Sequence, residues 1–407
     1  MTRKKIFGVI EGFYGTPWSH ENRLACIDFI SQVGWNTYVW AAKQEPRHRD
    51  QWNDPFTDDE LTCFSELSHR ATTVDVAVGL TPGDNASEEQ VINKLFPAVH
   101  AGCKVIVLCF DDLPVLDAAQ HHQRLAHAVR DNIDVPVWIV PTHYAGITAS
   151  PYLTALCTGL HSEIEVMWTG TTVVTDRMTS EQALQRKEAT GGRSPLVWDN
   201  TPVNDARMRP HLHMGPLTGR ENSMLDHCSG FLWNPMEEFA ASLPTLVSAA
   251  AWSRNEDPIN AWNSYIDKEN LRLIAEATSY RSDFQWPGES PPRSWWEAVR
   301  DMTINDPQLQ PWVKAAKSGA AIALAALSVI EARDELSSKE KNIILFQLMG
   351  WAGHRSQEKL TFGAGPRTRP IATQDSSGRF ELLPASVEES DSLVDDLVRR
   401  ALTRLRG

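Results

Sequence analysis

The chain has 407 residues, of which 42% are hydrophobic and 22% are charged, and its formal net charge is −13 at pH 7. This length suits a barrel with an annex, and the composition is typical of a soluble globular enzyme. The acidic balance offers no basic face to a phosphate backbone, so we expect no nucleic acid as a partner.

The N-terminal residues and the cysteines indicate where the protein works. No apolar run reaches the roughly 18 residues needed to span a bilayer. The apolar stretch 6–10 is followed at once by Glu11, so it is too short for the hydrophobic region of a secretory signal peptide. The six cysteines are widely spaced and show neither CxxC pairs nor the spacing of metal ligands. We therefore expect reduced thiols, a cytoplasmic location and no membrane partner.

Short apolar runs alternate with longer amphipathic segments from the N-terminus to about residue 252. The runs are almost continuously apolar, as in parallel strands that are covered on both faces. We predict strands over residues 6–13, 37–42, 75–80, 105–110, 135–140, 164–168, 195–198 and 230–233. We predict helices over residues 21–33, 58–72, 87–101 and 114–130, with Ser19 and Ser87 as N-caps.

Eight strand–helix repeats predict an α/β fold, a TIM (β/α)8 barrel in residues 1–256. A doubly wound open sheet is the alternative, but it needs fewer strands and usually a glycine-rich first turn, and no GxGxxG follows the first strand. Residues 257–407 predict a mostly helical C-terminal region, the helical annex, with helices over 262–280, 292–301, 311–337 and 387–405. Glycine, proline, arginine and serine between residues 353 and 379 predict a long surface loop.

Polar and aromatic residues gather just after the predicted strands, where a TIM barrel has its active site. Tryptophan ends three of the eight strands, at Trp168, Trp198 and Trp233. Loop starts are polar in any protein, but flat aromatic rings beside carboxylates, amides and lysine are typical of carbohydrate sites. These positions predict a pocket that binds a sugar.

Two adjacent carboxylates, Asp111 and Asp112, follow the fourth predicted strand. Both reach one site only if the strand ends or bulges there, because successive side chains of a strand point to opposite faces. One alternative is that one of them caps the next helix, with Pro114 as its first residue. A conventional retaining pair needs carboxyls about 5 Å apart across the bond, which neighbouring residues seldom achieve. Another possibility is substrate-assisted hydrolysis, in which the 2-acetamido oxygen of the substrate is the nucleophile.

Five runs resemble, in order, the successive motifs of glycoside hydrolase family 84. They are GVIEGFYGTPW at 8–18, NTYVWAAK at 36–43 followed by His48 and Arg49, FDD at 110–112, WDN at 198–200 with VND at 203–205, and NP at 234–235. The family includes the O-GlcNAcases and bacterial β-N-acetylglucosaminidases. The resemblance covers about residues 6–250 and does not clearly extend over the helical annex.

The resemblance implies a retaining β-N-acetylglucosaminidase that hydrolyses terminal β-linked GlcNAc through an oxazoline intermediate. Asp111 would orient and polarise the acetamido N–H, and Asp112 would be the general acid and then the base that activates water. The other implied residues hold sugar hydroxyls or line the acetamide pocket, and they are Gly12, Lys43, Tyr144, Trp198, Asn200, Asp205 and Asn234.

The sequence departs from the family pattern at a few positions and leaves alternatives open. Gln44 and Glu45 stand where the family usually has two aspartates, and His143 stands where a glutamate is common. No metal or organic cofactor is expected. The expected substrate is an N-acetylglucosaminyl glycoside or glycoprotein, and a homodimer stays open. The alternative functions are a hyaluronidase-like endo-acting hexosaminidase and a catalytically silent GlcNAc-binding barrel.

Overall fold

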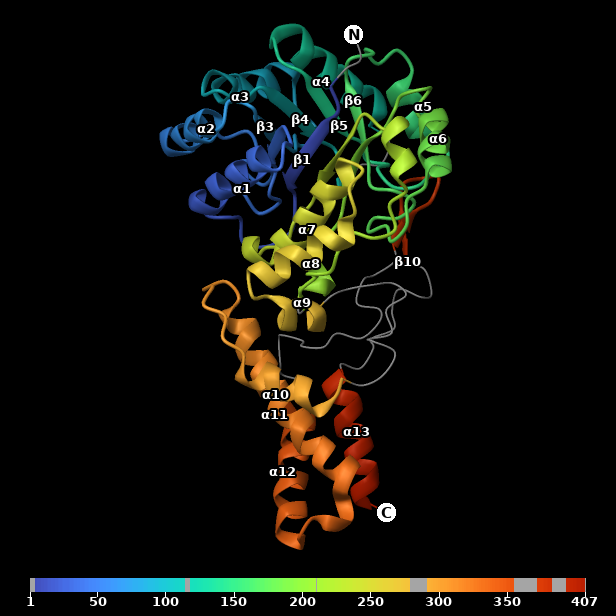
Figure 1. The fold of residues 1–407 in the computed structure, drawn as a ribbon. Coiled ribbons are helices and arrows are strands. Elements are labelled where there is room, and N and C mark those ends of the chain that lie inside the picture. Colours follow the sequence, from blue (N-terminus) through green and yellow to red (C-terminus); the bar gives the residue numbers. More distant parts are fainter. Residues whose placement is uncertain are drawn as a thin grey trace.

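Eight parallel strands form a closed barrel in the computed structural model, which describes residues 4–113, 118–209, 211–278, 291–354, 372–382 and 393–406 (Figure 1). They are β1 (Ile6–Glu11), β2 (Thr37–Trp40), β3 (Asp75–Leu80), β4 (Val105–Cys109), β5 (Val137–Val140), β6 (Glu165–Trp168), β7 (Leu196–Asp199) and β8 (Gly230–Trp233). Each strand pairs with the next, and β1 closes the ring on β8, with Gly8 opposite Leu232. The predicted TIM barrel is confirmed, and the open sheet is wrong.

Helices surround the barrel. They are α1 (His20–Gln32), α2 (Asp58–Arg70), α3 (Glu88–His100), α4 (Ala119–Asn132), α5 (Pro151–Cys157), α6 (Ser180–Ala189) and α7 (Phe239–Ser253). The helices α1 to α6 stand between successive strands from β1 to β7, and α7 follows β8. Ser19 and Ser87 are N-caps as predicted, because their hydroxyls accept the backbone N–H groups of Asn22 and Gln90, each at 3.2 Å. The predicted helix 114–130 begins later, at Ala119, and residues 114–117 lie outside the described part of the chain.

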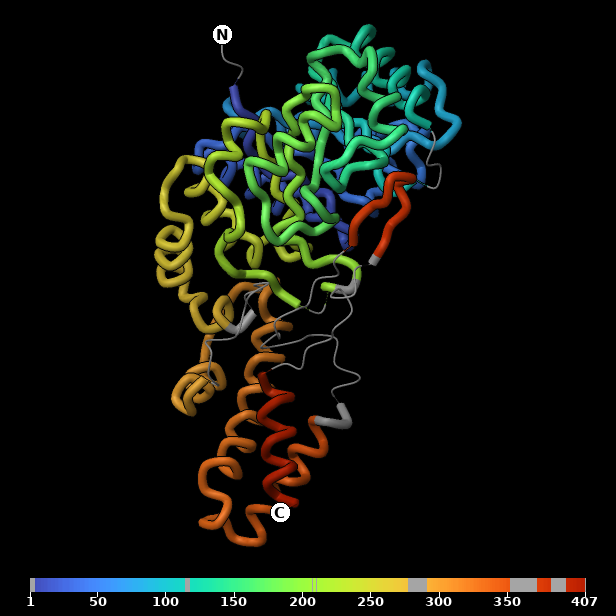
Figure 2. Tube along the Cα trace, turned by 90° about the vertical axis from the view of Figure 1, so that its right-hand side faces the viewer, coloured from blue at the N-terminus to red at the C-terminus, as the bar shows by residue number. Residues whose placement is uncertain are grey.

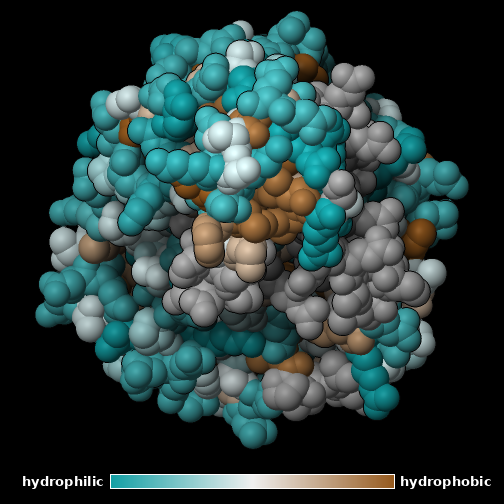
Figure 3. All heavy atoms as spheres, turned by 90° about the horizontal axis from the view of Figure 1, so that it is seen from below, coloured by the Kyte–Doolittle hydropathy of each residue, from teal (hydrophilic) through white to brown (hydrophobic). Residues whose placement is uncertain are grey.

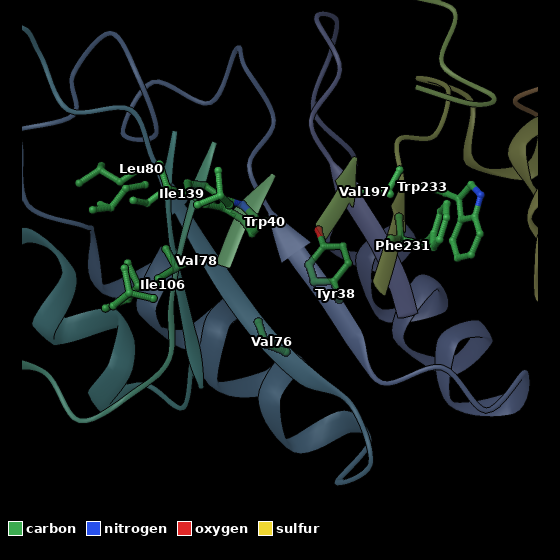
Figure 4. Close-up of a cluster of buried hydrophobic side chains, with 14 of the residues drawn as sticks. Tyr38, Trp40, Val76, Val78, Leu80, Ile106, Ile139, Val197, Phe231 and Trp233 are labelled. Atoms are coloured by element: carbon green, nitrogen blue, oxygen red, sulfur yellow. The ribbon is translucent and has the colours of Figure 1, made fainter. Parts of the chain in front are cut away.

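Side chains of the strands alternate between two layers of the core. Ile10, Val39 and Val107 are among those that fill the barrel interior. Their neighbours along each strand, such as Tyr38 and Trp40, pack outward against the helices (Figure 4). This alternation follows from the two-residue period of a strand.

The same alternation corrects the prediction that tryptophans at strand ends are sugar platforms. Trp168 and Trp233 stand at outward positions and are fully buried in the layer between strands and helices. Trp233 stacks on Trp35 with ring centroids 4.5 Å apart. Trp198 stands at an inward position of β7 and reaches the barrel mouth.

The annex extends from one end of the barrel as a group of helices (Figure 1). Its helices are α8 (Pro258–Lys268), α9 (Arg272–Thr278), α10 (Arg293–Asp301), α11 (Gln310–Ala332), α12 (Ser338–His354) and α13 (Leu393–Arg406). The predicted helix 262–280 is two helices, α8 and α9, and its last two residues lie outside the described part, as do residues 387–392 of the last predicted helix. We did not predict α12, because its apolar residues lie on both faces and give no single stripe.

Helix α11 corrects one expectation from composition. The stretch from Gln310 to Glu335 is long and apolar enough to cross a membrane by length and composition alone, so the statement that no run has this length was wrong. In the fold, α11 packs against α10, α12 and α13 and buries Trp312, Ala320 and Leu327. Its apolar residues thus form the core of the annex.

A β-hairpin stands between α12 and α13 in sequence and lies beside the barrel (Figure 2). Its strands are β9 (Ala372–Gln374) and β10 (Phe380–Leu382), which pair antiparallel. The predicted surface loop 353–379 is therefore wrong for residues 372–374, which are in β9, and for 353 and 354, which are in α12, whereas residues 375–379 form the turn of the hairpin. Residues 355–371 lie outside the described part of the chain.

Candidate active site

A pocket of about 250 Å³ lies at the mouth of the barrel where the strands end. Eight of the nine predicted site residues line it: Gly12, Lys43, Asp111, Asp112, Tyr144, Trp198, Asn200 and Asp205. The ninth, Asn234, stands behind the wall and contacts two of the lining residues. A larger hollow, of about 510 Å³, lies where β1, β6 and β8 begin and contains none of the predicted residues.

The two neighbouring carboxylates follow the end of β4. The strand stops at Cys109, and Asp112 adopts the left-handed conformation, with φ of 54°. The chain therefore turns at this point, and both side chains face the pocket. The N-cap of α4 in the described part of the chain is Ala118, so neither carboxylate stands at that position. Pro114, the first residue of the helix in the capping alternative, lies outside the described residues.

Asp111 is held by a lysine from the neighbouring strand end. Lys43 Nζ donates to Asp111 Oδ2 at 2.6 Å, and both side chains are buried. Burial opposes the charge of the ammonium, but the Asp111 carboxylate outweighs it, so the pKa of Lys43 is raised above its ordinary value. Asp111 Oδ1 is also buried, and it has no hydrogen-bond partner among the described residues. Asp111 is thus a fixed carboxylate with one acceptor oxygen available in the pocket.

Asp112 is held by two phenols instead of a cation. Tyr14 donates to its Oδ2 at 2.8 Å, and Tyr144 donates to its Oδ1 at 2.9 Å. Burial, and then the Asp112 carboxylate, raise the pKa of Tyr144 well above its ordinary value, so this hydroxyl stays protonated. Arg49 donates to the Tyr14 hydroxyl at 2.8 Å and to the backbone carbonyl of Asp112 at 2.9 Å.

Amide and indole groups build one wall of the pocket. Asn200 Oδ1 accepts from Trp198 Nε1 and from Asn234 Nδ2, both at 2.9 Å. Asn234 Oδ1 in turn accepts the backbone N–H of Gly12 at 3.2 Å. A Cβ on Gly12 would lie 2.2 Å from the Trp198 ring, so only glycine fits beside the indole. This network fixes the indole, and the hydrogen bonds of these amide groups are made within the protein itself.

Asp205 closes the pocket on the side of Tyr14. Its Oδ2 accepts the backbone N–H of Tyr14 at 2.8 Å. Burial raises the pKa of Asp205 to about 6, with a smaller contribution from the nearby Asp112 carboxylate. Asp205 therefore changes charge within the pH range of many enzymes.

Known proteins match this chain in sequence and in fold. A sequence profile of the β-N-acetylglucosaminidase family matches residues 7–283. The chain belongs to this family. It is 28% identical to the protein O-GlcNAcases of Rattus norvegicus and Mus musculus over 279 residues, which are 62% of this chain and 30% of each relative. The chain thus spans less than a third of the length of these relatives.

The solved structures agree on the fold. A mutant of the Thermobaculum terrenum O-GlcNAc hydrolase superposes on 98% of this chain and 93% of its own, with a TM-score of 0.76 and 21% sequence identity. Because residues 1–256 are only part of the chain, a superposition that covers 98% of the chain also includes the annex. The fold of the annex therefore also has a relative among solved structures.

Every site residue that we predicted lies inside the segment that matches the β-N-acetylglucosaminidase family, whereas the hairpin lies outside it. The hairpin still lines the pocket, through Ala372 and Phe380. The Phe380 ring lies 6.0 Å from the ring of Tyr144. No feature of the glycine-rich and serine-rich sequence around the hairpin predicted this contact. Tyr14 and Arg49 were also missed as site residues, although both stand within or beside motifs of the family.

His143, which departs from the family pattern, lies where the hairpin docks. Its Nδ1 lies 2.7 Å from the Ser150 hydroxyl, and a Cβ on Gly378 would overlap the imidazole. Gln374 strengthens the docking, because its side chain accepts from the Ala145 N–H at 3.0 Å and donates to the Thr142 carbonyl at 2.9 Å. The other departures, Gln44 and Glu45, are not among the residues that line the pocket.

Proposed function

We propose that this protein is a retaining, exo-acting β-N-acetylglucosaminidase that removes terminal β-linked GlcNAc by substrate-assisted catalysis. The observation that carries the proposal is Asp111, one oxygen of which is bound by Lys43 while the other is buried in the pocket without a partner among the described residues. A buried acceptor of this kind needs a donor, and the amide N–H of a 2-acetamido sugar supplies one.

In the first step, the acetamido carbonyl oxygen attacks C1 of the sugar and the C1–O bond to the aglycone breaks. Asp111 accepts the amide N–H and stabilises the positive charge that develops on the oxazoline. Asp112 gives its proton to the departing oxygen. In the second step, Asp112 takes a proton from water, and the water oxygen attacks C1 on the face that the aglycone left. The C1–O bond of the oxazoline breaks as the new bond forms, which restores the acetamide and retains the configuration.

The remaining predicted residues would surround the sugar. Tyr144 and Trp198 would line the acetamide pocket, and Lys43, Asp205 and the backbone of Gly12 would contact hydroxyls. The internal hydrogen bonds of Asn200 and Asn234 support a role in holding Trp198 and Gly12 in place, in addition to any direct contact.

The size of the pocket supports cleavage of terminal sugars. Its volume of about 250 Å³ is below the roughly 300–1,000 Å³ of sites for drug-sized ligands, and so suits one sugar ring better than a polymer. Phe380 of the hairpin stands at the pocket beside Tyr144, where an aglycone would leave. A hyaluronidase-like endo-acting enzyme would need an open groove at this place.

The test is hydrolysis of a chromogenic β-GlcNAc glycoside and of the matching β-glucoside, which lacks the acetamide. We expect cleavage of the first and not of the second, and a loss of about 10²–10⁴-fold in Asp112→Asn. Asp28→Asn, which alters an exposed aspartate of α1, is the control and should keep full activity. Equal cleavage of the glucoside would contradict the substrate-assisted mechanism. Binding of GlcNAc without turnover would favour the silent binding barrel.

The wider biology follows as part of the same proposal. We expect a cytoplasmic enzyme of carbohydrate metabolism that acts on GlcNAc-bearing glycosides or glycoproteins, with residues 1–256 as the catalytic unit and 257–407 as its annex. A homodimer is supported by α12, which exposes Ile343, Phe346 and Met349, and Figure 3 shows apolar side chains gathered on the face seen from the annex end. Sedimentation analysis of Phe346→Glu against the unmodified chain tests this contact, and a monomer in both would contradict it.

A further inference from the structure

The two tyrosines that hold Asp112 differ in their own surroundings. The Tyr14 hydroxyl accepts an N–H of Arg49 at 2.8 Å while it donates to Asp112 Oδ2. The Tyr144 hydroxyl donates to Asp112 Oδ1, and in the part of the chain that the structure describes no second hydrogen bond reaches it. One phenol is therefore fixed in its orientation, and the other is free to turn.

The chemistry of arginine decides the orientation of Tyr14. A guanidinium has N–H donors and no acceptor, so Arg49 can only donate to the phenol oxygen. The one hydrogen of the Tyr14 hydroxyl is then left for Asp112 Oδ2. Because this hydrogen points at Oδ2 in both protonation states of the carboxyl group, Oδ2 is an acceptor throughout the reaction.

Arg49 also holds the backbone that carries the carboxylate. Its second N–H group donates to the Asp112 carbonyl at 2.9 Å, at a residue with φ of 54°. A left-handed conformation is uncommon for a residue other than glycine and persists where the surroundings hold it. Arg49 thus fixes both the turn and one oxygen of Asp112.

We propose that Arg49 is a positioning residue for the proton cycle of Asp112: by fixing Tyr14 as a donor to Oδ2, it leaves Oδ1 as the oxygen that carries the transferable proton. This inference rests on the proposed function. In the first step, the Oδ1–H bond breaks and the proton passes to the aglycone oxygen as the C1–O bond breaks. In the second step, Oδ1 takes a proton from water as the water oxygen bonds to C1 and the C1–O bond of the oxazoline breaks. Tyr144 turns aside when Oδ1 is protonated and donates again when it is not.

Several other groups face Asp112 and stay unchanged in the test. Lys43 from the end of β2, Asp111 beside it and Asp205 beyond β7 all interact electrostatically with the cluster of Asp112, Tyr14 and Arg49. Replacing Arg49 alone removes one cation and two hydrogen bonds from this set. Tyr14 is then no longer held as a donor to Asp112 Oδ2, while the contact of Tyr144 with Oδ1 remains.

The experiment compares Arg49→Gln with Arg49→Lys and with the control Arg47→Gln, which alters an arginine of the same segment that pairs with Glu60. Each is assayed on a phenyl β-GlcNAc glycoside, whose leaving group needs a proton, and on the 2,4-dinitrophenyl glycoside, whose leaving group does not. We expect Arg49→Gln to lose about 10- to 100-fold in kcat/KM on the phenyl glycoside and less than about 3-fold on the activated one. Its pH profile on the phenyl glycoside should differ from that of the unmodified chain. Arg49→Lys should recover part of both effects, and Arg47→Gln should show neither.

Tyr14→Phe tests whether Arg49 acts through the phenol. It should reproduce the dependence on the leaving group. The double variant should lose less than the two single losses combined, because both substitutions disturb the same donor to Oδ2, although Arg49→Gln also removes the hydrogen bond to the Asp112 carbonyl. Equal losses on both glycosides with an unchanged pH profile would assign Arg49 a purely structural role and overturn the inference. Thermal unfolding and inhibition by free GlcNAc report whether the variants are folded. Failure of the unmodified chain to cleave either glycoside would instead overturn the proposed function, and this inference with it.

Discussion

The ion pair of Lys43 with Asp111 gives the sharpest prediction about the site. Lys43→Met keeps the length and apolar stem of the side chain and removes the ammonium. Asp111 then loses the cation at 2.6 Å and remains buried, with neither oxygen bonded by a described residue. The variant therefore tests whether Asp111 works as a carboxylate that is held in place.

The size of the effect follows from the geometry. A hydrogen bond to a charged group contributes about 1.5–3 kcal/mol, which corresponds to about 10- to 150-fold in kcat/KM. Breaking a buried ion pair by removing one partner destabilises a protein by about 3–5 kcal/mol, because the remaining charge is left unpaired. We therefore expect Lys43→Met to be less active and less stable than the unmodified chain.

The assay is a double-mutant cycle of Lys43→Met and Asp111→Asn, read in both kcat/KM and Tm. Asp111→Asn in the Lys43→Met background should raise Tm, since it removes the unpaired charge, but it should not restore activity. The double variant should be no slower than Asp111→Asn alone. Arg70→Gln, which breaks the exposed pair with Asp28, is the control and should change neither quantity by much. Additive losses in kcat/KM would show that Lys43 and Asp111 act separately and would refute the reasoning.

Three further predictions concern the walls of the pocket. Gly12→Ala should lower kcat/KM at least about 10-fold, because its Cβ would lie 2.2 Å from the Trp198 ring; retained activity in steady-state assays would show that the indole can move. Phe380→Ala should raise KM for glycosides with bulky aglycones while Tm changes little, since half of the side chain is exposed, and an unchanged KM across aglycones would remove the hairpin from the site. Burial raises the pKa of Asp205 to about 6, so ionisation of this carboxyl group should lower the stability of the fold as pH rises from about 4 to 6. Over this window the Tm of Asp205→Asn should rise relative to that of the unmodified chain, and a Tm difference that stays constant would contradict the shift.

The strands could be predicted from the sequence because each is a short apolar run bounded by polar residues. The predicted bounds of β3 and β8 match the structure, and the others differ by a few residues at their ends. The resemblance to the family then assigned nine site residues at or after the ends of these strands, and eight of them line one pocket. This worked because the carboxyl ends of all strands in a closed parallel barrel meet at the same mouth.

The predictions that failed depended on side-chain direction, on contacts between distant parts of the sequence, or on a helix without a single apolar stripe. Counting tryptophans at strand ends ignored the alternation that turns Trp168 and Trp233 outward and only Trp198 inward. The hairpin contributes Phe380 through pairing with loops more than 200 residues earlier, and no local pattern carries that information. Helix α12 was missed because its apolar residues do not form one stripe.

Adjacent carboxylates can divide the chemistry because the barrel gives them different partners. Lys43 can only donate, so the oxygen that it binds stays an acceptor, and the other oxygen of Asp111 has no partner among the described residues. The phenols of Tyr14 and Tyr144 are protonated donors that can also accept, so they can accompany Asp112 whether it carries a proton or not. Under the proposed function, a cation on one carboxylate and phenols on the other would thus give two neighbouring residues of the same type separate tasks, and the turn after β4 brings both to one pocket.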